Sequence, residues 1–508
     1  MGLSFILLTI LSALIAYVIH RLNKNRFYWQ SLGIACEEPH FFFGNLRGIQ
    51  ATRGFWEVWQ EYYQRFKGTG PFAGFYWFFK PAVFVLEPDL IKHILIKDFH
   101  NFSDRGFFHN EQDDPLSGQL FLLEGVKWKH MRQKLSPTFT SGKMKFMFPS
   151  VVKVGGELIE VLDKLLVEKK GASVLEIKEL MARYTTDVIG SCAFGIECSS
   201  LKDPNAEFRL MGSRSLVEHK HNRLFIGFMA SFCDLARKLH MKQTPDDIEA
   251  FFMRIVKETV DYREKNNVRR NDFMDMLIDM KNNKMMKSEH GDVQTNLTLE
   301  EIAAQAFVFF NAGFETSSTT LGFALYELAK NQQIQDRARK EVVEKLHKFE
   351  GELSYECMKE MVYLEQILME TLRLYTVLPV LNRVALEDYV VPGNPKYVIK
   401  KGMQVLIPSG AIHRDERYYP NPLEFNPDNF SPENVAQRDS VLFLGFGEGP
   451  RNCIGLRFGK MEAIIGLALL LKHYRFSICE KTQIPLTYGK VSYLIGTDRG
   501  IYLKVEKI

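Results

Sequence analysis

Apolar residues recur at helical spacing through most of the chain, with polar residues between them. Amphipathic patterns of this kind, including residues 177–194 and 247–262, predict successive helices in the middle of the sequence. A longer apolar run extends from Leu299 to about Ala329. It follows Thr298 and Glu301, whose spacing is that of a capping box, and so predicts one long buried helix.

Two stretches carry the pattern of strands instead. Residues 72–79 and 82–86 are β-branched and aromatic runs separated by a Lys-Pro pair, which predicts a small sheet. Near the C-terminus, the apolar run 454–471 predicts another buried helix. Together these patterns predict a mainly α fold with a small β region.

The N-terminus begins with the predominantly apolar run Leu3–Ile19, whose 17 residues are near the short limit for a membrane span. Basic residues follow it, and neither a basic n-region nor an A-x-A-like cleavage site is present. We therefore expect residues 1–20 to form an uncleaved membrane anchor helix, with the rest of the chain on the cytosolic face. A cleaved or merely interfacial segment is the alternative.

The remaining chain shows no internal repeat, low-complexity tract or Pro/Gly/Ser-rich linker. We expect residues 21–45 to form a basic and aromatic linker, in which Phe27, Tyr28 and Trp29 fit an aromatic belt at the membrane surface. Residues 46–508 are predicted to form one catalytic domain.

Composition narrows the class of protein. Of the 508 residues, 46% are hydrophobic and 40 are Phe, which is enough for a large aromatic core and suits a lipophilic pocket, although most of these Phe must be core. The net charge of +4 is modest for this size and does not indicate nucleic-acid binding. Seven cysteines without a CxxC pair or framework spacing indicate a reducing compartment.

Residues 446–455 form a glycine-rich turn that places Cys453 just before the predicted C-terminal helix. Gly447 and Gly449 allow positive φ and a close approach of the backbone to a flat ligand. The helix N-terminus and Arg451 are expected to favour the thiolate form of Cys453. A thiolate beneath a planar cofactor is typical of a haem iron ligand. A buried structural cysteine is the simpler alternative.

The centre of the long helix has an unusual composition. Gly313 costs about 1 kcal/mol relative to Ala within a helix, so it indicates a close approach of backbone and ligand. Thr316 can bond back to the carbonyl of Ala312, and Glu315 beside it could relay protons. A packing glycine with an ordinary threonine is the alternative.

Two further pairs share helix faces. Trp128 and Arg132, four residues apart, combine an indole donor with a guanidinium and so suit a carboxylate. Their surroundings are basic, which fits either a solvated face or a docking surface for an acidic electron donor. Glu370 and Arg373, three residues apart, would contribute little if exposed.

The residues Phe446, Gly447, Gly449, Arg451, Cys453 and Gly455 reproduce the haem-binding signature of the cytochromes P450. The chain resembles that family over roughly residues 30–508, and segments 136–145 and 176–183 resemble the insect family 6 of microsomal members. The chain departs from the family pattern at three positions. Most members have Pro at the position of Gly445, and many have Pro at the position of Thr376. In the segment 422–430, Asn429 stands where the family usually has Arg.

The resemblance implies a triangular helical prism with haem between the long helix and the cysteine loop. It implies that Cys453 is the axial ligand of the iron and that Glu370 and Arg373 form a buried structural pair. Further implied cofactor-binding residues are Trp128, Arg132, Arg383 and Arg451 at the propionates, with Phe446, Gly447, Gly455, Ala312 and Gly313. Implied substrate contacts are Phe107, Phe108, Phe121, Val377, Leu378 and Leu494.

The implied reaction is monooxygenation, with Thr316 and Glu315 delivering protons. The implied cofactor is haem b, with O2 as co-substrate. Electrons would come from NADPH through NADPH-cytochrome P450 reductase, with cytochrome b5 as a further partner; the chain itself has no flavin or nicotinamide fingerprint. The implied location is the endoplasmic reticulum membrane, and the implied substrates are xenobiotics such as insecticides and plant toxins, or endogenous hormones. The rival functions are a thiolate-haem isomerase or dehydratase acting on hydroperoxides and a haem carrier or sensor.

Overall fold

The computed structural model describes residues 5–6, 9, 12–13, 25–41, 43–168, 171–282, 286–288, 291–293 and 296–508. Its helices are α2 Tyr28–Ser31, α3 Phe55–Phe66, α4 Pro88–Lys92, α5 Gly125–Leu135, α6 Ser141–Glu168, α7 Ile177–Ile189, α8 Glu207–Val217, α9 Arg223–Ser231, α10 Cys233–Lys238, α11 Asp246–Asn266, α12 Phe273–Lys281, α13 Leu299–Lys330, α14 Gln332–Lys348, α15 Tyr355–Lys359, α16 Val362–Leu374, α17 Ser409–Ile412, α18 Pro432–Ala436 and α19 Leu456–His473. Its strands are β1 Phe72–Trp77, β2 Lys80–Val85, β3 Ala172–Glu176, β4 Met286–Ser288, β5 Gly291–Val293, β6 Leu381–Val384, β7 Tyr389–Val390, β8 Val398–Ile399, β9 Gln404–Ile407, β10 Tyr474–Ser477 and β11 Tyr502–Lys507.

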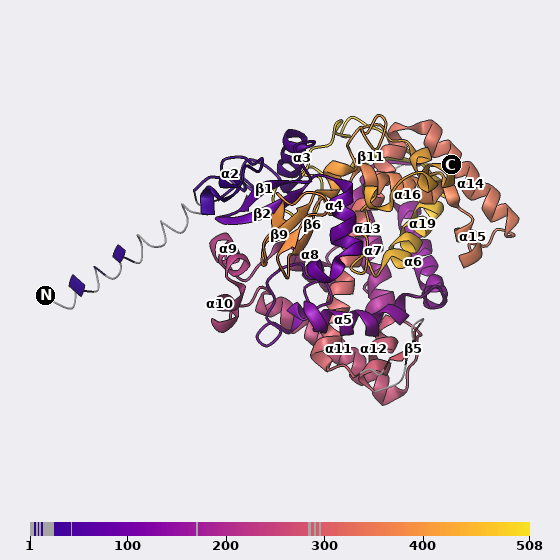
Figure 1. Cartoon of the computed structure of the whole chain (residues 1–508). Coiled ribbons are helices and arrows are strands. Elements are labelled where there is room, and N and C mark those ends of the chain that lie inside the picture. Colours follow the sequence, from indigo (N-terminus) through magenta and orange to yellow (C-terminus); the bar gives the residue numbers. More distant parts are fainter. Residues whose placement is uncertain are drawn as a thin grey trace.

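The long helix α13 runs through the middle of the molecule, where α7, α16 and α19 pack around it (Figure 1). Its N-terminus is the predicted capping box: Thr298 Oγ1 accepts from the Glu301 amide, and Glu301 Oε2 accepts from the Thr298 amide at 2.9 Å. Both bonds satisfy amides that a helix N-terminus leaves free. The predicted long helix is therefore confirmed, and α13 is the central support of the fold.

The main sheet lies at one side of the helical body, with strand order β1-β2-β9-β6 (Figure 1). The predicted strands pair antiparallel, with Phe72 opposite Val85, and β2 continues the sheet in parallel with β9. The antiparallel pairing of β6 with β9 sets Arg383 opposite Val405. A second sheet has the order β10-β11-β3. The mainly helical fold with a small β region agrees with the expectation from the sequence.

The predicted linker is packed against this sheet over the part that the structure describes. Trp29 is fully buried, and its Nε1 donates to the Phe75 carbonyl at 3.1 Å. Gly74 leaves room for the indole, because a Cβ there would lie 2.2 Å from Trp29. The expectation that Trp29 belongs to an aromatic belt at a membrane surface is therefore wrong, since its ring is part of the core.

The predicted anchor, residues 1–20, falls almost entirely outside the described residues. Among the residues that are described, no helix combines the length and apolar character needed to cross a membrane. The predicted helix 177–194 is α7 followed by a π-helical turn, Gly190–Phe194.

Candidate active site

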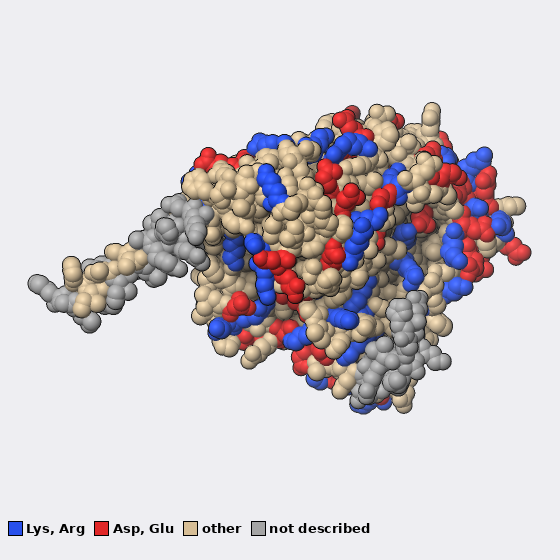
Figure 2. All heavy atoms as spheres, in the orientation of Figure 1, with Lys and Arg blue, Asp and Glu red and all other residues tan. Residues whose placement is uncertain are grey.

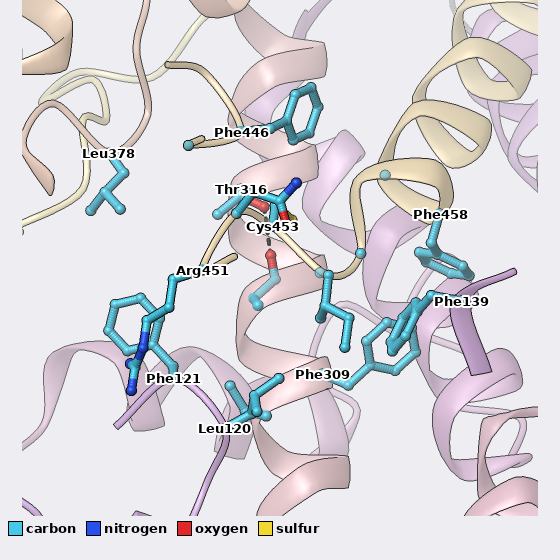
Figure 3. A pocket seen from close by; sticks show the side chains of 18 of the residues that line it. Leu120, Phe121, Phe139, Phe309, Thr316, Leu378, Phe446, Arg451, Cys453 and Phe458 are labelled. Atoms are coloured by element: carbon cyan, nitrogen blue, oxygen red, sulfur yellow. Dashed lines mark hydrogen bonds between the residues drawn. The ribbon is translucent and has the colours of Figure 1, made fainter. Parts of the chain in front are cut away.

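A cavity of about 290 Å³ lies between α13 and the loop that leads into α19. Its wall includes Cys453 and Thr316, which face the same space from these two elements (Figure 3). Phe121 and Leu378 appear at one side of this view, and Phe458 at the other. The cavity therefore brings the predicted cysteine ligand and the predicted proton-handling threonine together in apolar surroundings.

Backbone bonds hold the cysteine loop in a tight turn. The Cys453 amide donates to the Phe446 carbonyl at 2.8 Å, and the Gly447 amide donates to the Leu444 carbonyl at 2.9 Å. Gly447 has φ of +71° and Gly449 of +74°, and a Cβ on Gly449 would lie 1.9 Å from the Leu95 carbonyl oxygen. Only glycine fits this position without displacing the backbone beside it.

The electrostatics around Cys453 differ from the expectation. Burial raises the pKa of the Cys453 thiol, and this outweighs the lowering by the Gly455 amide, Arg132 and Arg105. Arg451 points elsewhere, because its Nη2 donates to the Leu123 carbonyl at 2.6 Å. The Gly455 amide at the start of α19 thus lowers this pKa, as expected of the helix N-terminus, whereas Arg451 is not among the groups that favour the thiolate. A bound metal ion would lower the pKa of this thiol and favour the thiolate.

One face of α13 forms a wall of the cavity. Its lining residues recur at intervals of three and four, as one helix face requires. They are Gln305, Val308, Phe309, Ala312, Gly313, Thr316, Ser317 and Thr320. Thr316 Oγ1 donates to the Ala312 carbonyl, as expected, and this bond is drawn in Figure 3. Helical spacing from Ala312 and Thr316 would have found the other members of the set.

Glu315 does not line this cavity. Its position beside Thr316 rotates it by about 100° around the helix, toward α7. There both carboxylate oxygens accept from Lys178 Nζ, at 2.8 and 2.9 Å. The Lys178 and Glu315 side chains are 26% and 20% exposed. The structure thus separates the predicted acid–alcohol pair onto two faces of α13.

Four arginines surround the cavity and form what we call the arginine cluster: Arg105, Arg132, Arg383 and Arg451. Burial and the other guanidiniums of the cluster lower the pKa of Arg105 well below its usual value. Burial, with Arg451 nearby, lowers the pKa of Arg383 to about 9, and burial lowers that of Arg451 to about 10. All three pKa values are lowered because burial and neighbouring positive charges destabilise the charged form of each guanidinium.

Several atoms of the arginine cluster are buried without a hydrogen-bond partner among the described residues: Arg383 Nε, and Nε and Nη1 of Arg451. Arg132 is engaged, since its guanidinium donates to the carbonyl and side-chain oxygens of Asn452 at 2.9 and 2.8 Å. Trp128 lies under Arg451, with 4.3 Å between the guanidinium carbon and the ring centre.

A planar dianion fits this site. Haem carries two propionates, which would supply acceptors for the unpartnered guanidinium nitrogens, while its ring would occupy the apolar space beside Cys453. Trp128, Arg132, Arg383 and Arg451 all line the cavity, as do Phe446, Gly447, Gly455, Ala312 and Gly313. Arg105 belongs with them, although sequence reasoning did not select it. Its position two and three residues before Phe107 and Phe108, which the resemblance implied as substrate contacts, was the available signal.

The predicted substrate contacts divide into two groups. Phe121, Val377 and Leu378 line the cavity. The others, Phe107, Phe108 and Leu494, are absent from its lining. Phe107 stacks on Phe121 at 5.7 Å between ring centres and so supports the wall from behind. Phe108 packs in a separate cluster with Met229, where it is ordinary core.

Further aromatic residues that sequence reasoning missed complete the wall. Phe309 contacts Phe139 and Phe458, with ring centres 5.4 and 5.1 Å apart. Gln305 holds another part of it: its Oε1 accepts from the Leu120 amide at 2.9 Å, and its Nε2 donates to the Gly118 carbonyl at 3.0 Å. These residues come from elements distant in sequence, which local patterns cannot bring together.

Glu370 and Arg373 are fully buried and doubly hydrogen-bonded, with Arg373 Nε at 2.7 Å from Glu370 Oε2 and Nη2 at 2.8 Å from Oε1. The remaining Arg373 donors reach carbonyls of residues 413, 422 and 424. Asn429 Nδ2 donates to Glu370 Oε1 at 3.1 Å. The Asn429 amide thus contacts the carboxylate of the pair, a role that its donor group fits.

The surface around α5 carries acidic side chains beside the basic ones that the local sequence shows. Lys127 pairs with Glu111 at 3.0 Å, and Lys145 pairs with Glu356. On the face drawn in Figure 2, basic and acidic side chains are interspersed.

Comparison with known proteins identifies the family. The family model described as Cytochrome P450 matches residues 34–505. Probable cytochrome P450 6a21 and cytochrome P450 6a9 of Drosophila melanogaster are 64% and 62% identical to the chain, each over 508 residues and the full length of both proteins. Cytochrome P450 6A1 of Musca domestica is 50% identical over 506 residues, covering 99% of this chain and 98% of the relative. With its cysteine loop and arginine cluster around one cavity, the chain belongs to the cytochrome P450 family, within the insect family 6, and is a haem-dependent monooxygenase.

Proposed function

We propose that the chain inserts one oxygen atom of O2 into lipophilic small molecules, using electrons from NADPH delivered by NADPH-cytochrome P450 reductase. The observation that carries this proposal is the cavity itself. It sets one thiol and four guanidiniums against a largely apolar wall. A haem with two propionates and an apolar substrate would together meet these three kinds of surface.

Haem b, when bound, supplies the chemistry of oxygen activation. Cys453 would ligate its iron through Sγ, and the loop bonds from Phe446 and Leu444 would fix the direction of that sulfur. Trp128 and the arginine cluster would hold the propionates. The unpartnered nitrogens of Arg383 and Arg451 are the donors still free for this purpose.

Thr316 would present its hydroxyl inside the cavity and pass a proton to reacting oxygen there. Glu315 would act from the adjacent face of α13, toward α7, where its pair with Lys178 is partly open to solvent. In this arrangement the acid collects protons outside the cavity and the alcohol delivers them inside. The Thr316 bond to the Ala312 carbonyl would hold the hydroxyl until it is needed.

The substrate would be a lipophilic compound such as an insecticide, a plant toxin or a hormone. Phe121, Val377 and Leu378 would contact it, because they line the cavity and carry no polar group. Phe107 would act indirectly by stacking on Phe121. Phe108 and Leu494 lie outside the lining, so we assign them no direct contact in the conformation described.

Cytochrome b5 would be an alternative electron donor. Lys129 and Lys134, on the surface of α5, would contribute to docking these acidic partners. We further propose residues 1–20 as a membrane anchor, 21–45 as the connection and 46–508 as the catalytic domain on the cytosolic face of the endoplasmic reticulum. The apolar N-terminal run and the basic residues after it support this orientation.

The first test is the carbon-monoxide difference spectrum of the reduced, membrane-expressed protein. The native chain should show the Soret shift of thiolate-ligated haem, and Cys453→Ala should lose it. Cys233→Ala, which changes a cysteine on α10 away from the cavity, is the matched control. A thiolate-type spectrum from Cys453→Ala would overturn the assignment.

The second test measures turnover with reductase, NADPH and a panel of lipophilic probes. We expect substrate-dependent NADPH use and hydroxylated products. Thr316→Ala should retain haem but divert NADPH consumption into hydrogen peroxide, whereas Thr316→Ser should restore product formation. Unchanged coupling in Thr316→Ala would contradict the proton-delivery role.

A further inference from the structure

His413, just after α17, is a buried imidazole with a partner at each ring nitrogen. The ring is fully buried, as are Thr376 and the Leu444 backbone that it joins. His413 Nδ1 lies 2.7 Å from Thr376 Oγ1. On its other side the Leu444 amide donates to His413 Nε2 at 2.7 Å.

These contacts determine where the imidazole carries its proton. Because the Leu444 amide is a donor only, Nε2 must be the unprotonated acceptor, and the proton must reside on Nδ1. Nδ1 then donates to Thr376 Oγ1, whose own proton points to the Arg373 carbonyl at 3.2 Å. All three hydrogen bonds thus point in one direction, from the Leu444 amide through His413 and Thr376 to the Arg373 carbonyl in the last turn of α16. If His413 were doubly protonated, its Nε2–H would face the Leu444 N–H, and this hydrogen bond would be lost.

The two ends of this chain belong to opposite parts of the active site. Thr376 directly precedes Val377 and Leu378, which line the cavity. Leu444 also lines it and begins the loop that ends at Cys453. His413 is therefore a short connection between the cavity wall and the start of the cysteine loop.

Packing fixes the imidazole in this place. Phe443, next to Leu444, stacks on the His413 ring with 5.3 Å between centres and 11° between planes. Gly445 leaves room for this stack, because a Cβ there would lie 2.6 Å from Phe443 Cζ. The backbone of His413 is held as well, because its carbonyl accepts from Arg373 Nη1 at 2.9 Å. This bond connects the residue to the buried Glu370–Arg373 pair.

We propose that His413 is a positioning residue for the cysteine ligand, which holds the start of the cysteine loop in register with the cavity wall through Thr376. It acts as a neutral, Nδ1-protonated imidazole and touches neither substrate nor cofactor. This inference rests on the proposed role of Cys453 as the iron ligand.

The first experiment removes the Thr376 hydroxyl while keeping its shape. In haem-loaded protein, the conversion of the thiolate-type carbon-monoxide spectrum to the spectrum of thiolate-free haem is followed with time. Thr376→Val should convert roughly three- to tenfold faster than the native chain, the size expected for one lost buried hydrogen bond. Thr376→Ser, which keeps the hydroxyl, should convert at the native rate.

Thr371→Val is the matched control, since Thr371 is equally buried but its hydroxyl donates within its own helix, to the Ile367 carbonyl at 2.7 Å, with no other partner among the described residues. Native-rate conversion in this variant supports the proposal. Equal acceleration in Thr371→Val and Thr376→Val would reduce the effect to general destabilisation and overturn it, as would a native rate in Thr376→Val. A native chain without the thiolate-type spectrum would instead refute the role of Cys453.

A second measurement does not depend on turnover. Nitrogen-15 resonances of histidine-labelled protein report the tautomer of each ring, and the resonance lost in His413→Gln identifies His413. We expect a neutral Nδ1–H form that does not titrate near neutral pH. An Nε2–H form, or a ring that gains a proton in that range, would overturn the proposal.

Discussion

Two groups of buried charges in this molecule differ in how fully their hydrogen bonds and charges are satisfied. Around Arg373, Nε, Nη1 and Nη2 all have acceptors within 3.0 Å, and Glu370 balances the charge. In the arginine cluster, three nitrogens of Arg383 and Arg451 are buried without acceptors among the described residues, and the guanidiniums lower one another's pKa values. The first group is complete within the described residues, whereas in the second Asp104 comes only within 3.8 Å of Arg451, and the three nitrogens remain available to an anion from outside the chain.

This difference separates structural charges from binding charges. A buried ion with all its hydrogen bonds made holds the fold together, and removing its partner is costly. A group of buried like charges opposes the fold and is tolerated where a ligand relieves it. The unsatisfied region, and not the satisfied one, is therefore the place where we propose that the cofactor binds.

The largest effect is expected from breaking the complete pair. Glu370→Gln leaves the Arg373 charge buried without its carboxylate and should lower the free energy of unfolding by about 3–5 kcal/mol. Urea unfolding of the haem-loaded protein measures it. Glu360→Gln, which removes a partly exposed pairing with Lys345 and Lys348, should cost far less, because solvent screens these charges. Equal losses in the two variants would contradict the distinction.

Removing one member of the arginine cluster should affect the haem-free and the haem-loaded protein differently. Arg383→Met relieves repulsion in the haem-free protein, so its free energy of unfolding should stay unchanged or rise. The same change removes charge-assisted bonds to a propionate and should speed haem release to a scavenging protein by about tenfold or more. Arg65→Met, at an exposed arginine, should change neither quantity. Strong destabilisation of haem-free Arg383→Met would show that the cluster is structural.

Glu462 sharpens the comparison because it has neither a balancing cation nor a cavity. It is fully buried, and burial raises its pKa well above 4.5, although the nearby Ser317 hydroxyl acts in the opposite direction; neither carboxyl oxygen has a hydrogen bond of good geometry among the described residues. The folded chain therefore keeps a proton that the unfolded chain releases above pH 4.5, so this residue lowers stability as pH rises. Glu462→Gln should be more stable than the native chain by roughly 1–3 kcal/mol at neutral pH.

Unfolding by urea at several pH values checks this sign. The advantage of Glu462→Gln should shrink as the pH falls below 4.5, where both states of the native chain hold the proton. An advantage that is independent of pH would show that Glu462 does not carry a shifted proton.

The smallest effect is expected at the partly exposed pair. Lys178→Met removes the partner of Glu315 and should change the free energy of unfolding by no more than about 1 kcal/mol, because solvent screens the charge that remains. Thermal unfolding measures this change. A loss as large as that of Glu370→Gln would place Lys178 and Glu315 with the complete, structural charges.

Much of the fold could be predicted from local patterns. The capping box located α13, the aromatic runs located β1 and β2, and the glycine turn before an apolar helix located Cys453. Each signal lies within a few residues of what it determines. The short helix spacing likewise placed Glu370 and Arg373 together on α16.

The sequence by itself determined which residues can ligate iron, cap helices and form strands, because those properties depend on residue type and near neighbours. Only the tertiary structure decided that Glu315 turns toward Lys178, that Arg105 joins the arginine cluster and that Phe108 belongs to the core. It also decided the direction of the pKa shift at Cys453, where burial raises the pKa more than the nearby cations lower it. These outcomes depend on which distant segments exclude water from a side chain, and no local pattern specifies that.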